Sequence, residues 1–578
     1  MKSRYLVLAV CIAVGVTVAA PSWYFHFFEP SYRGIELFGS DAEDAYVALI
    51  QEVYDGHPLL GNAYWAREKD QPYILQPLSP MLVAGLGKVL FLSAVEVNLL
   101  TKFLLPFLLA LLVYLLFKDI TGRTGTALSM MLFVLLIQAT WVWLNPGSWD
   151  DILFSQRLPG VDDNFLSYAR PINPQVSSFF FFGYLLCLWR ALFTETALER
   201  AKRYAIAAAV ILGLSFYTYF FTFSFLFAFN AALLLWYLWK RERQSARTLF
   251  FITGGALLIG IPYFFNLYEI MRSPFSGYVA TVNGSVEGRH FILSKVWWGF
   301  ALVLALAWKH IGRIKVFALA FLAASFLMTN QQLITNVSLP VPAHYNWYYI
   351  APVCGALLIY FAVLFFEKRS RAPFVQAFLL LVGAVFFYTA FLVQQQSYKT
   401  HQPYFVGIQR YADVLAFADT ALPKESVVLA NENLSNLLAT YTSHNVHYST
   451  KVVNFLVDPA RVRASYYLYL ALQGLDAEHA ESYFGEHRND IGSTLYGMRY
   501  REQNGCGGCF PENVFQKLVF EYKEFMKGDW LRRELKKYGV QYVLWDKTAD
   551  GVWQLDRFFT KELYAEDGLI IYDVAADL

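Results

Sequence analysis

The amino-acid sequence predicts a polytopic α-helical membrane protein that carries a soluble α/β domain at its C-terminal end. Hydrophobic residues make up 57% of the 578 residues and charged residues only 16%, a composition outside the range of soluble globular proteins. Apolar runs of about 20 residues, the length that crosses a bilayer core, recur as far as residue 394 and then give way to mixed charge. The net charge of +2 gives no reason to expect nucleic acid as a partner.

The apolar runs predict about eleven transmembrane helices. The first run follows Lys2 and Arg4 and has the pattern of a signal peptide, but the many later runs favour a retained first helix. The region 204–239 is too long for one span, and we expect it to divide within residues 216–223 into two. The other predicted spans centre on residues 98–117, 125–145, 175–193, 248–268, 293–309, 314–334, 347–366 and 373–394.

The segment 77–93 decides the orientation of the spans that follow it. It is short, opens with two prolines and contains Lys88, so we expect an interfacial or re-entrant helix. A crossing helix is the alternative, because one lysine in a span costs only about 2.5–3.5 kcal/mol on insertion scales. If the segment does not cross, five later basic segments share the side of the basic N-terminus, as the positive-inside rule requires. These segments are 118–123, 199–203, 240–247, 309–315 and 367–371.

This topology divides the chain into a membrane part, 1–394, and a soluble part, 395–578. In the soluble part, helical patterns alternate with the strand-like runs "SVVLAN", "QYVLWD" and "LIIYDV", which predicts a small α/β domain. We expect a multi-pass protein of the cytoplasmic (inner) membrane whose soluble domain is periplasmic. The segments expected on the same outer side are 26–97, 146–174 and 269–292.

The stretch "GSDAEDAYVALIQEVYDGH", residues 39–57, predicts an amphipathic helix that three carboxylates open. Ser40 and Glu43 have the spacing of a capping box, and Asp41 suits the positive end of the helix dipole. Capping does not explain Asp44, which projects from the face opposite the apolar stripe. We expect the helix to lie along the membrane surface with Asp44 away from lipid; an ordinary solvated polar face is the alternative.

The second outer segment contains one arginine and two pairs of adjacent carboxylates. Arg170 stands beside the next span, where it can bind a lipid phosphate bidentately or, as an ordinary surface pair, neutralise a nearby aspartate. The carboxylates include no Asp-x-Asp motif, so they allow a divalent cation, Mg²⁺ or Mn²⁺, without favouring one. They are Asp150, Asp151, Asp162 and Asp163.

A later outer segment combines amides, a histidine and aromatic residues, the kinds of side chain that bind sugars through hydrogen bonds and ring stacking. Trp347 and Tyr348 are better interpreted as an aromatic belt at the bilayer boundary. The polar candidates for substrate binding are Gln331, Gln332, His344 and Asn346.

The motif "GCGGC" in the tail contains Cys506 and Cys509. It lacks a second Cys or His pair at metal-binding spacing, which disfavours a zinc site. A local disulfide is the favoured interpretation in an oxidising compartment, and a thioredoxin-like redox pair is the alternative.

The first 125 or so residues resemble the GT-C glycosyltransferases, a class of membrane enzymes that includes protein mannosyltransferases, aminoarabinose transferases and oligosaccharyltransferases. The resemblance lies in the order of one span, an acidic outer segment with a carboxylate-led helix, and a proline-led helix followed by a second span, "SPMLVAGLGKVLFLSAVEVNLLTKFLLPFLLALLVYLLFKDITGR". Lys102 stands where many members carry arginine. Many members also have adjacent Asp and Glu before an aromatic residue, whereas "DAEDAY" leaves Asp41, Glu43 and Asp44 as alternatives for the catalytic position.

The resemblance implies transfer of a sugar from a polyprenyl-phosphate donor to a glycan, lipid or protein acceptor, with inversion at the anomeric carbon. A carboxylate at the membrane boundary would take the acceptor's proton, and cationic groups such as Arg170 or Lys102 would stabilise the leaving phosphate. No Gly-rich phosphate loop, HExxH pair or GxSxG elbow is present in the sequence.

Two other classes of function stay open. A transporter or flippase of lipid-linked saccharides should carry polar residues deep within several spans, whereas the acidic groups here gather outside the membrane. A non-catalytic membrane scaffold should tolerate loss of the carboxylates in the first outer segment.

The predicted orientation can be tested by labelling single cysteines, introduced into a cysteine-free chain, with a membrane-impermeant thiol reagent. We expect a cysteine at Asp70 to react from the outer side and a cysteine at Arg123 to react only after the membrane is opened. Labelling that places the first outer segment in the cytosol would exclude surface chemistry on a lipid-linked donor.

Overall fold

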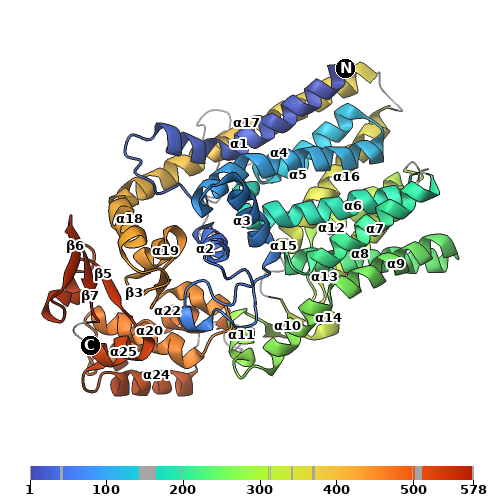
Figure 1. The fold of residues 1–578 in the computed structure, drawn as a ribbon. Coiled ribbons are helices and arrows are strands. Elements are labelled where there is room, and N and C mark those ends of the chain that lie inside the picture. Colours follow the sequence, from blue (N-terminus) through green and yellow to red (C-terminus); the bar gives the residue numbers. More distant parts are fainter. Residues whose placement is uncertain are drawn as a thin grey trace.

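The computed structural model describes residues 2–39, 43–141, 165–194, 197–309, 311–312, 314–339, 343–367, 372–497, 499–500 and 511–575. It consists of a large helical part and a smaller α/β domain that packs against one end of it (Figure 1). One helix, α2, lies between the two.

The helical part follows from the apolar runs. Its longer helices are α1 Lys2–Phe28, α4 Ala94–Thr121, α5 Thr124–Trp141, α6 Ser177–Leu192, α7 Leu198–Ser215, α8 Phe220–Trp239, α9 Arg243–Ile259, α10 Ile261–Arg272, α12 Lys295–Ala307, α13 Ile314–Thr329, α16 Ala351–Glu367 and α17 Ala372–Gly407. Short elements on the side of the α/β domain are α11 Ser276–Val282, α14 Gln332–Thr335, α15 Ala343–Tyr345 and the antiparallel pair β1 Val286–Glu287 and β2 Val337–Ser338. The α7 and α8 helices separate at residues 216–219, inside the predicted break.

Among the described residues, six helices are long and apolar enough to cross a membrane, or up to seven if α9 and α10, which meet at 52°, form one bent span. Four further apolar helices are shorter: α3 (Leu78–Leu90), Thr124–Leu136 within α5, α12 and α13. The helices therefore indicate a multi-pass membrane protein. The count of about eleven spans stays a prediction.

The segment expected to be interfacial forms α3, a helix of 13 residues. At 1.5 Å per residue this is roughly 20 Å long, too short for a hydrocarbon core of about 30 Å. Its exposed face is apolar: the exposed fractions of Val89 and Leu90 are 74% and 46%. Such a helix suits the boundary of a bilayer, with its apolar face toward lipid.

The α/β domain contains a five-stranded mixed sheet in the order β4-β3-β5-β7-β6. The three predicted strands are β3 Val427–Leu429, β5 Tyr542–Asp546 and β7 Leu569–Asp573, joined by β4 Asn445–Val446 and β6 Glu562–Glu566. The helices are α18 Ala412–Ala421, α19 Glu432–Tyr441, α20 Pro459–Leu472, α21 Ala480–Glu486, α22 Arg488–Tyr496, α24 Glu512–Phe525 and α25 Trp530–Tyr538. The predicted boundary at residue 395 falls inside α17, because that helix continues through the polar residues that follow its apolar part.

The α2 helix, Glu43–Tyr54, does not lie on the membrane surface as expected from its sequence. It contacts α3 and α4 on one side and α19 of the α/β domain on the other, so that Val47, Ala48 and Ile50 are all buried (Figure 1). The helix approaches α3 closely at Gly87, where a β-carbon would collide with the Tyr54 hydroxyl. The α/β domain thus covers part of the side that the sequence left to solvent, and Asp44 stays partly exposed.

Specific contacts join the α/β domain to residues 26–97, the first of the segments predicted to lie outside the membrane. The Val446 amide, on edge strand β4, donates to the Tyr64 carbonyl at 2.8 Å, and the Trp65 indole donates to the His447 carbonyl at 3.2 Å. The Arg461 guanidinium lies 4.0 Å from the centroid of the Trp65 ring and pairs with Glu68. These contacts place the α/β domain directly over α2.

Candidate active site at the first turn of α2

The first turn of α2 is anchored by a buried ion pair. Glu43 is 0% exposed, and its Oε1 lies 2.6 Å from the Nζ of Lys102 on α4 and accepts from the Asn98 amide at 3.0 Å. Its Oε2 accepts from the Gly39 backbone amide, four residues earlier in the chain. Glu43 therefore fixes α2 to α4 and has no free face for a substrate.

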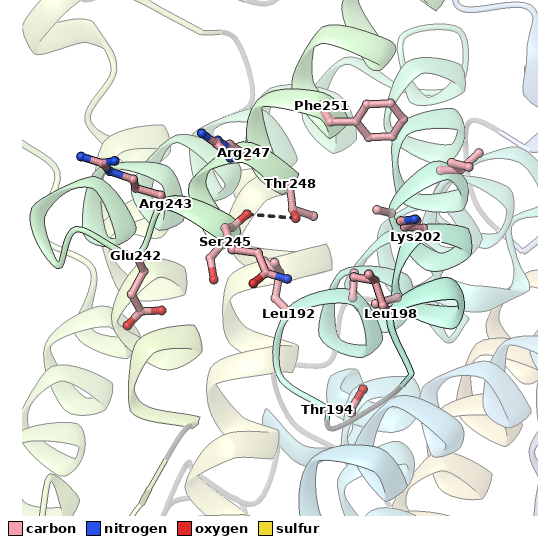
Figure 2. A pocket seen from close by; sticks show the side chains of 15 residues that line it. Leu192, Thr194, Leu198, Lys202, Glu242, Arg243, Ser245, Arg247, Thr248 and Phe251 are labelled. Carbon is pink, nitrogen blue, oxygen red and sulfur yellow. Dashed lines mark hydrogen bonds between the residues drawn. The ribbon is translucent and has the colours of Figure 1, made fainter.

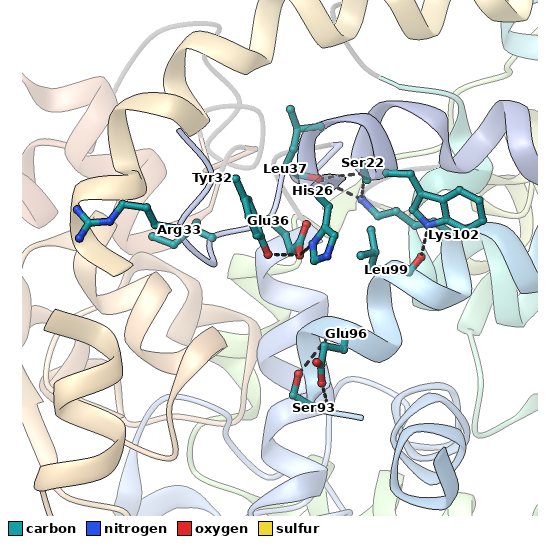
Figure 3. Close-up of polar contacts among 12 residues, drawn as sticks. Ser22, His26, Tyr32, Arg33, Glu36, Leu37, Ser93, Glu96, Leu99 and Lys102 are labelled. Atoms are coloured by element: carbon teal, nitrogen blue, oxygen red, sulfur yellow. Dashed lines mark hydrogen bonds and ion pairs between the residues drawn. The ribbon is translucent and has the colours of Figure 1, made fainter. Parts of the chain in front are cut away.

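Lys102 is held by the same network and is 1% exposed. Besides Glu43, its ammonium donates to the Ser22 hydroxyl at 2.7 Å and to the Leu37 carbonyl at 3.3 Å, as Figure 3 shows. An ammonium has three protons, and these three contacts use them. The structure thus places this predicted substrate-binding residue among protein groups.

A second buried carboxylate, Glu36, lies next to this pair. Its Oε1 accepts from the Tyr32 hydroxyl at 2.6 Å and lies 2.6 Å from Nδ1 of His26, while Oε2 is buried and has no partner among the described residues (Figure 3). Burial raises the pKa of Glu36, and the contacts with Tyr32 and His26 oppose that shift only in part.

Asp44 is the carboxylate of the first turn that solvent reaches, with 24% of its side chain exposed. It forms an ion pair with Lys451 of the α/β domain. Lys451 is held in place by the turn before it, because the Thr450 amide and hydroxyl donate to Glu432 at 2.9 Å and 2.7 Å. The Thr440 hydroxyl of α19 donates to the Asp44 carbonyl at 3.3 Å. The α/β domain therefore orients Asp44 through both its side chain and its backbone.

Arg170 lies on the other flank of the same turn. One of its terminal nitrogens donates to the Tyr46 hydroxyl at 2.8 Å, and its guanidinium carbon lies 5.1 Å from the centroid of the Tyr46 ring. Its Nε is buried without a hydrogen-bond partner, and Arg170 forms no salt bridge with any residue that the structure describes. A half-buried guanidinium with an unused donor is suited to an anionic ligand.

His344, also predicted from the sequence, belongs to the cluster around Arg170. Its Nδ1 lies 2.5 Å from the Tyr219 hydroxyl at the start of α8, and its ring lies 5.3 Å from that of Tyr348. Tyr46, Tyr219 and Tyr348 are all close enough to Arg170 to interact with its charge. Tyr348 is 5% exposed, so its interpretation as part of an aromatic belt is wrong, whereas Trp347 is 53% exposed.

Two π-helical segments adjoin this cluster. One, Pro171–Val176, begins directly after Arg170, and the other, Asn346–Ile350, follows His344 and contains Tyr348. Such segments widen a helix locally and are frequent at functional sites. The Asn346 Oδ1 atom is buried with no partner among the described residues, which leaves a further acceptor unused near His344.

Gln331 and Gln332 are not part of the cluster. Gln331 donates to the Val337 carbonyl at 2.8 Å and accepts from the Thr335 hydroxyl at 2.7 Å, which closes the turn around α14. Gln332 donates to the His290 carbonyl at 2.8 Å. Both amides therefore bind local groups around the β1–β2 pair.

Several predicted residues lie outside the described part of the chain. No group of three or more His, Cys, Asp or Glu residues that could hold a metal ion occurs among the residues that the structure describes. The undescribed predicted residues are Ser40, Asp41, Asp150, Asp151, Asp162, Asp163, Cys506 and Cys509.

Sequence reasoning missed three members of the site. Lys451 is more than 400 positions from Asp44 along the chain, and no local pattern connects the two. Tyr219 lies in the break between α7 and α8. Its position beside a helix start was a signal that could have marked it as a candidate site residue. Tyr46 was noted only as an early aromatic residue of α2.

No protein-family model and no curated protein matches the chain. Among solved structures, it is similar to the Archaeoglobus fulgidus oligosaccharyltransferase in the apo form, with a TM-score of 0.46 and 12% identity over 96% of this chain and 73% of that one. It is also similar to ArnT from Cupriavidus metallidurans bound to undecaprenyl phosphate, with a TM-score of 0.46 and 13% identity over 80% of this chain and 90% of that one.

A third similar structure is the archaeal oligosaccharyltransferase AglB from Archaeoglobus fulgidus in complex with an inhibitory peptide and a dolichol-phosphate. Its TM-score is 0.45, with 13% identity over 100% of this chain and 75% of that one. Oligosaccharyltransferases belong to the GT-C class that the sequence resembles. Similarity of this size assigns neither a reaction nor a substrate to this chain.

The buried pair generates a prediction about stability. Replacing Lys102 by Met should destabilise the protein by about 3–5 kcal/mol, because Glu43 would keep a buried charge without its partner. The double variant Lys102→Met with Glu43→Gln should recover part of that loss. Thermal unfolding of the full chain in detergent measures both, and a Lys102→Met protein as stable as the wild type would contradict the assigned role.

Glu36 generates a prediction about pH. Because burial raises its pKa, this group contributes stability that is fully present below its ordinary pKa and is lost as the pH rises through its folded-state pKa. Glu36→Gln mimics the protonated form, so it should raise the unfolding temperature at pH 8 and leave it unchanged at pH 4. The control is Glu29→Gln, a partly exposed carboxylate of the same segment, which should give no gain at pH 8. A loss of stability on Glu36→Gln at pH 8 would overturn the assignment.

Proposed function

We propose that this protein is a GT-C-like inverting glycosyltransferase that moves a sugar from a polyprenyl-phosphate donor to an acceptor hydroxyl at the outer face of the membrane. The observation that carries the proposal is the pair of groups on the two flanks of the first turn of α2. Asp44 is an accessible carboxylate, and two residues further along Tyr46 binds Arg170, a half-buried guanidinium with an unused donor. A base and an anion-binding cation at one helix start are what this transfer requires.

Asp44 and Arg170 each have one role in the proposed reaction. The Asp44 carboxylate takes the proton of the acceptor hydroxyl as its oxygen attacks the anomeric carbon of the sugar. The bond between that carbon and the phosphate oxygen breaks with its electron pair going to the phosphate. Arg170 stabilises the charge that develops on the departing lipid phosphate, and the single displacement inverts the anomeric centre.

His344 and Tyr219 complete the phosphate site. When the Tyr219 hydroxyl donates to Nδ1 of His344, the Nε2 of the ring carries the proton and can donate to a phosphate oxygen. Tyr46 holds the guanidinium through its hydroxyl and its ring without neutralising it. The apolar exposed face of α3, which packs against α2, provides a surface for the prenyl chain.

Asp44 must exchange its partner during the cycle. In this structure the Lys451 ammonium pairs with the carboxylate and orients it. The acceptor hydroxyl then replaces Lys451 at one carboxylate oxygen before the proton moves. Asp41, three residues earlier, is the alternative base, and Glu43 is disfavoured because its carboxylate is enclosed.

Transfer from labelled polyprenyl-phosphate sugars, in membranes that contain the chain, tests this proposal. We expect Asp44→Asn to lower transfer by about 10²–10⁴-fold, the usual contribution of a general base. Arg170→Gln should reduce kcat strongly. Arg170→Lys should recover part of the loss, because lysine restores the charge but not the planar guanidinium that can bind two phosphate oxygens at once. Asp55→Asn, at the other end of α2, is the matched control and should keep wild-type transfer.

The outcomes separate the alternatives. Full activity of Asp44→Asn with loss in Asp41→Asn would move the base to Asp41. Full activity of both variants would show that neither carboxylate is the general base and would contradict the proposed reaction. Movement of the lipid-linked saccharide across the membrane without transfer would indicate a flippase, and neither activity in the wild type with any of a panel of donors would favour a scaffold.

A further inference from the structure

A cleft of about 890 Å³ opens where the ends of α6, α7 and α9 meet (Figure 2). This volume is in the range of small-molecule sites. The cleft takes its walls from the end of α6, the first half of α7 and the first two turns of α9, and the bend between α8 and α9 lies at its rim. None of its residues belongs to the candidate active site.

The cleft is at the opposite end of the helical part from Arg170. The apolar segment Pro171–Leu192 begins directly after Arg170 and ends at the cleft. At 1.5 Å per residue these 22 residues measure roughly 33 Å, close to the hydrocarbon thickness of a bilayer. The candidate active site and the cleft therefore lie at opposite membrane boundaries.

The cleft is amphipathic. Leu198, Ile206 and Phe251 line it and are more than half exposed, which provides an apolar wall open to lipid. The same two helices also bring polar side chains to the opening: Figure 2 shows Lys202 on α7 and Ser245 and Thr248 on α9, with Thr194 between the helices. Gln244 is a further polar residue of the lining. A ligand with an apolar body and a polar head would match both surfaces.

The charge of the cleft is positive. Lys202, Arg243 and Arg247 line it, against the single lining carboxylate Glu242. Lys202 has a nearby partner, because its ammonium lies 2.8 Å from Glu199 on the same helix. Arg243 and Arg247 form no ion pair with any residue that the structure describes. Across the segments 199–203 and 240–247, seven basic residues stand against two acidic ones.

We propose that this cleft binds the headgroup phosphate of an anionic phospholipid of the inner leaflet. Arg243, Arg247 and Lys202 would attract the phosphate, and the Gln244 amide and Ser245 hydroxyl, which also line the cleft, would donate to its oxygens. The acyl chains would lie along the apolar wall. Basic pockets between membrane helices on the cytoplasmic side are suited to such headgroups. The proposal does not depend on the glycosyltransferase activity.

Native mass spectrometry of the purified full chain in detergent, titrated with phosphatidylglycerol, tests the proposal. The variant Arg243→Gln with Arg247→Gln should bind this lipid roughly thirtyfold more weakly, because each basic residue near an anionic lipid contributes a factor of about five. The matched control, Arg203→Gln with Arg241→Gln, removes the same charge from exposed residues that do not line the cleft and should bind as the wild type does.

Two further probes and one further variant make the result decisive. Phosphatidylcholine with the same acyl chains should bind weakly, and glycerol phosphate, the soluble headgroup, should bind far more weakly than the whole lipid. Equal binding of either probe, or wild-type binding by the glutamine pair, would overturn the proposal. The pair Arg243→Lys with Arg247→Lys keeps the charge and should keep most of the affinity; a loss as large as in the glutamine pair would also overturn it.

Discussion

The ion pair between Glu43 and Lys102 fixes the position of α2, and the candidate site depends on that position. Both groups are withdrawn from solvent at the boundary between the helical part and the first outer segment. An ion pair in such a place is costly to desolvate, and a broken one is costlier still, so α2 is held in a single register against α4. Asp44 and Tyr46 follow Glu43 on the same turn. The Glu43–Lys102 pair therefore sets the directions of the Asp44 and Tyr46 side chains, although neither residue belongs to that pair.

The α/β domain completes the site from the other side. It supplies Lys451 to Asp44 and a hydroxyl from α19 to the backbone of the same residue. It also docks on the first outer segment through the edge of its sheet and through the stacking of Arg461 on Trp65. This domain is thus a structural part of the candidate site, and its removal would expose buried residues of α2 to water. Its docking explains why an amphipathic helix that suits a membrane surface is enclosed instead.

The polar chemistry of the molecule is divided between the two ends of its helices. The end that carries Arg170 combines a carboxylate, a guanidinium and tyrosines with most of their donors and acceptors engaged by protein. The other end carries exposed basic residues around an open amphipathic cleft. The first arrangement is rigid and suits the handling of reacting atoms, whereas the second suits a lipid that exchanges with the bilayer. The same helix, α6, connects them.

The sequence by itself determined the multi-pass membrane class, the α/β domain, the break between α7 and α8 and the short helix at α3. These features follow from hydrophobic run length and from the periods of helices and strands, which are local properties. It also singled out Asp44, Arg170 and His344, because charged and polar side chains beside apolar spans are uncommon. Only the tertiary structure decided which of these groups are engaged by protein and which can meet a substrate. Lys102 pairs with Glu43, and Asp44 pairs with Lys451 from a distant part of the chain. The sequence did not predict these pairs, because burial and charge pairing depend on which segments pack together and leave no local sequence pattern.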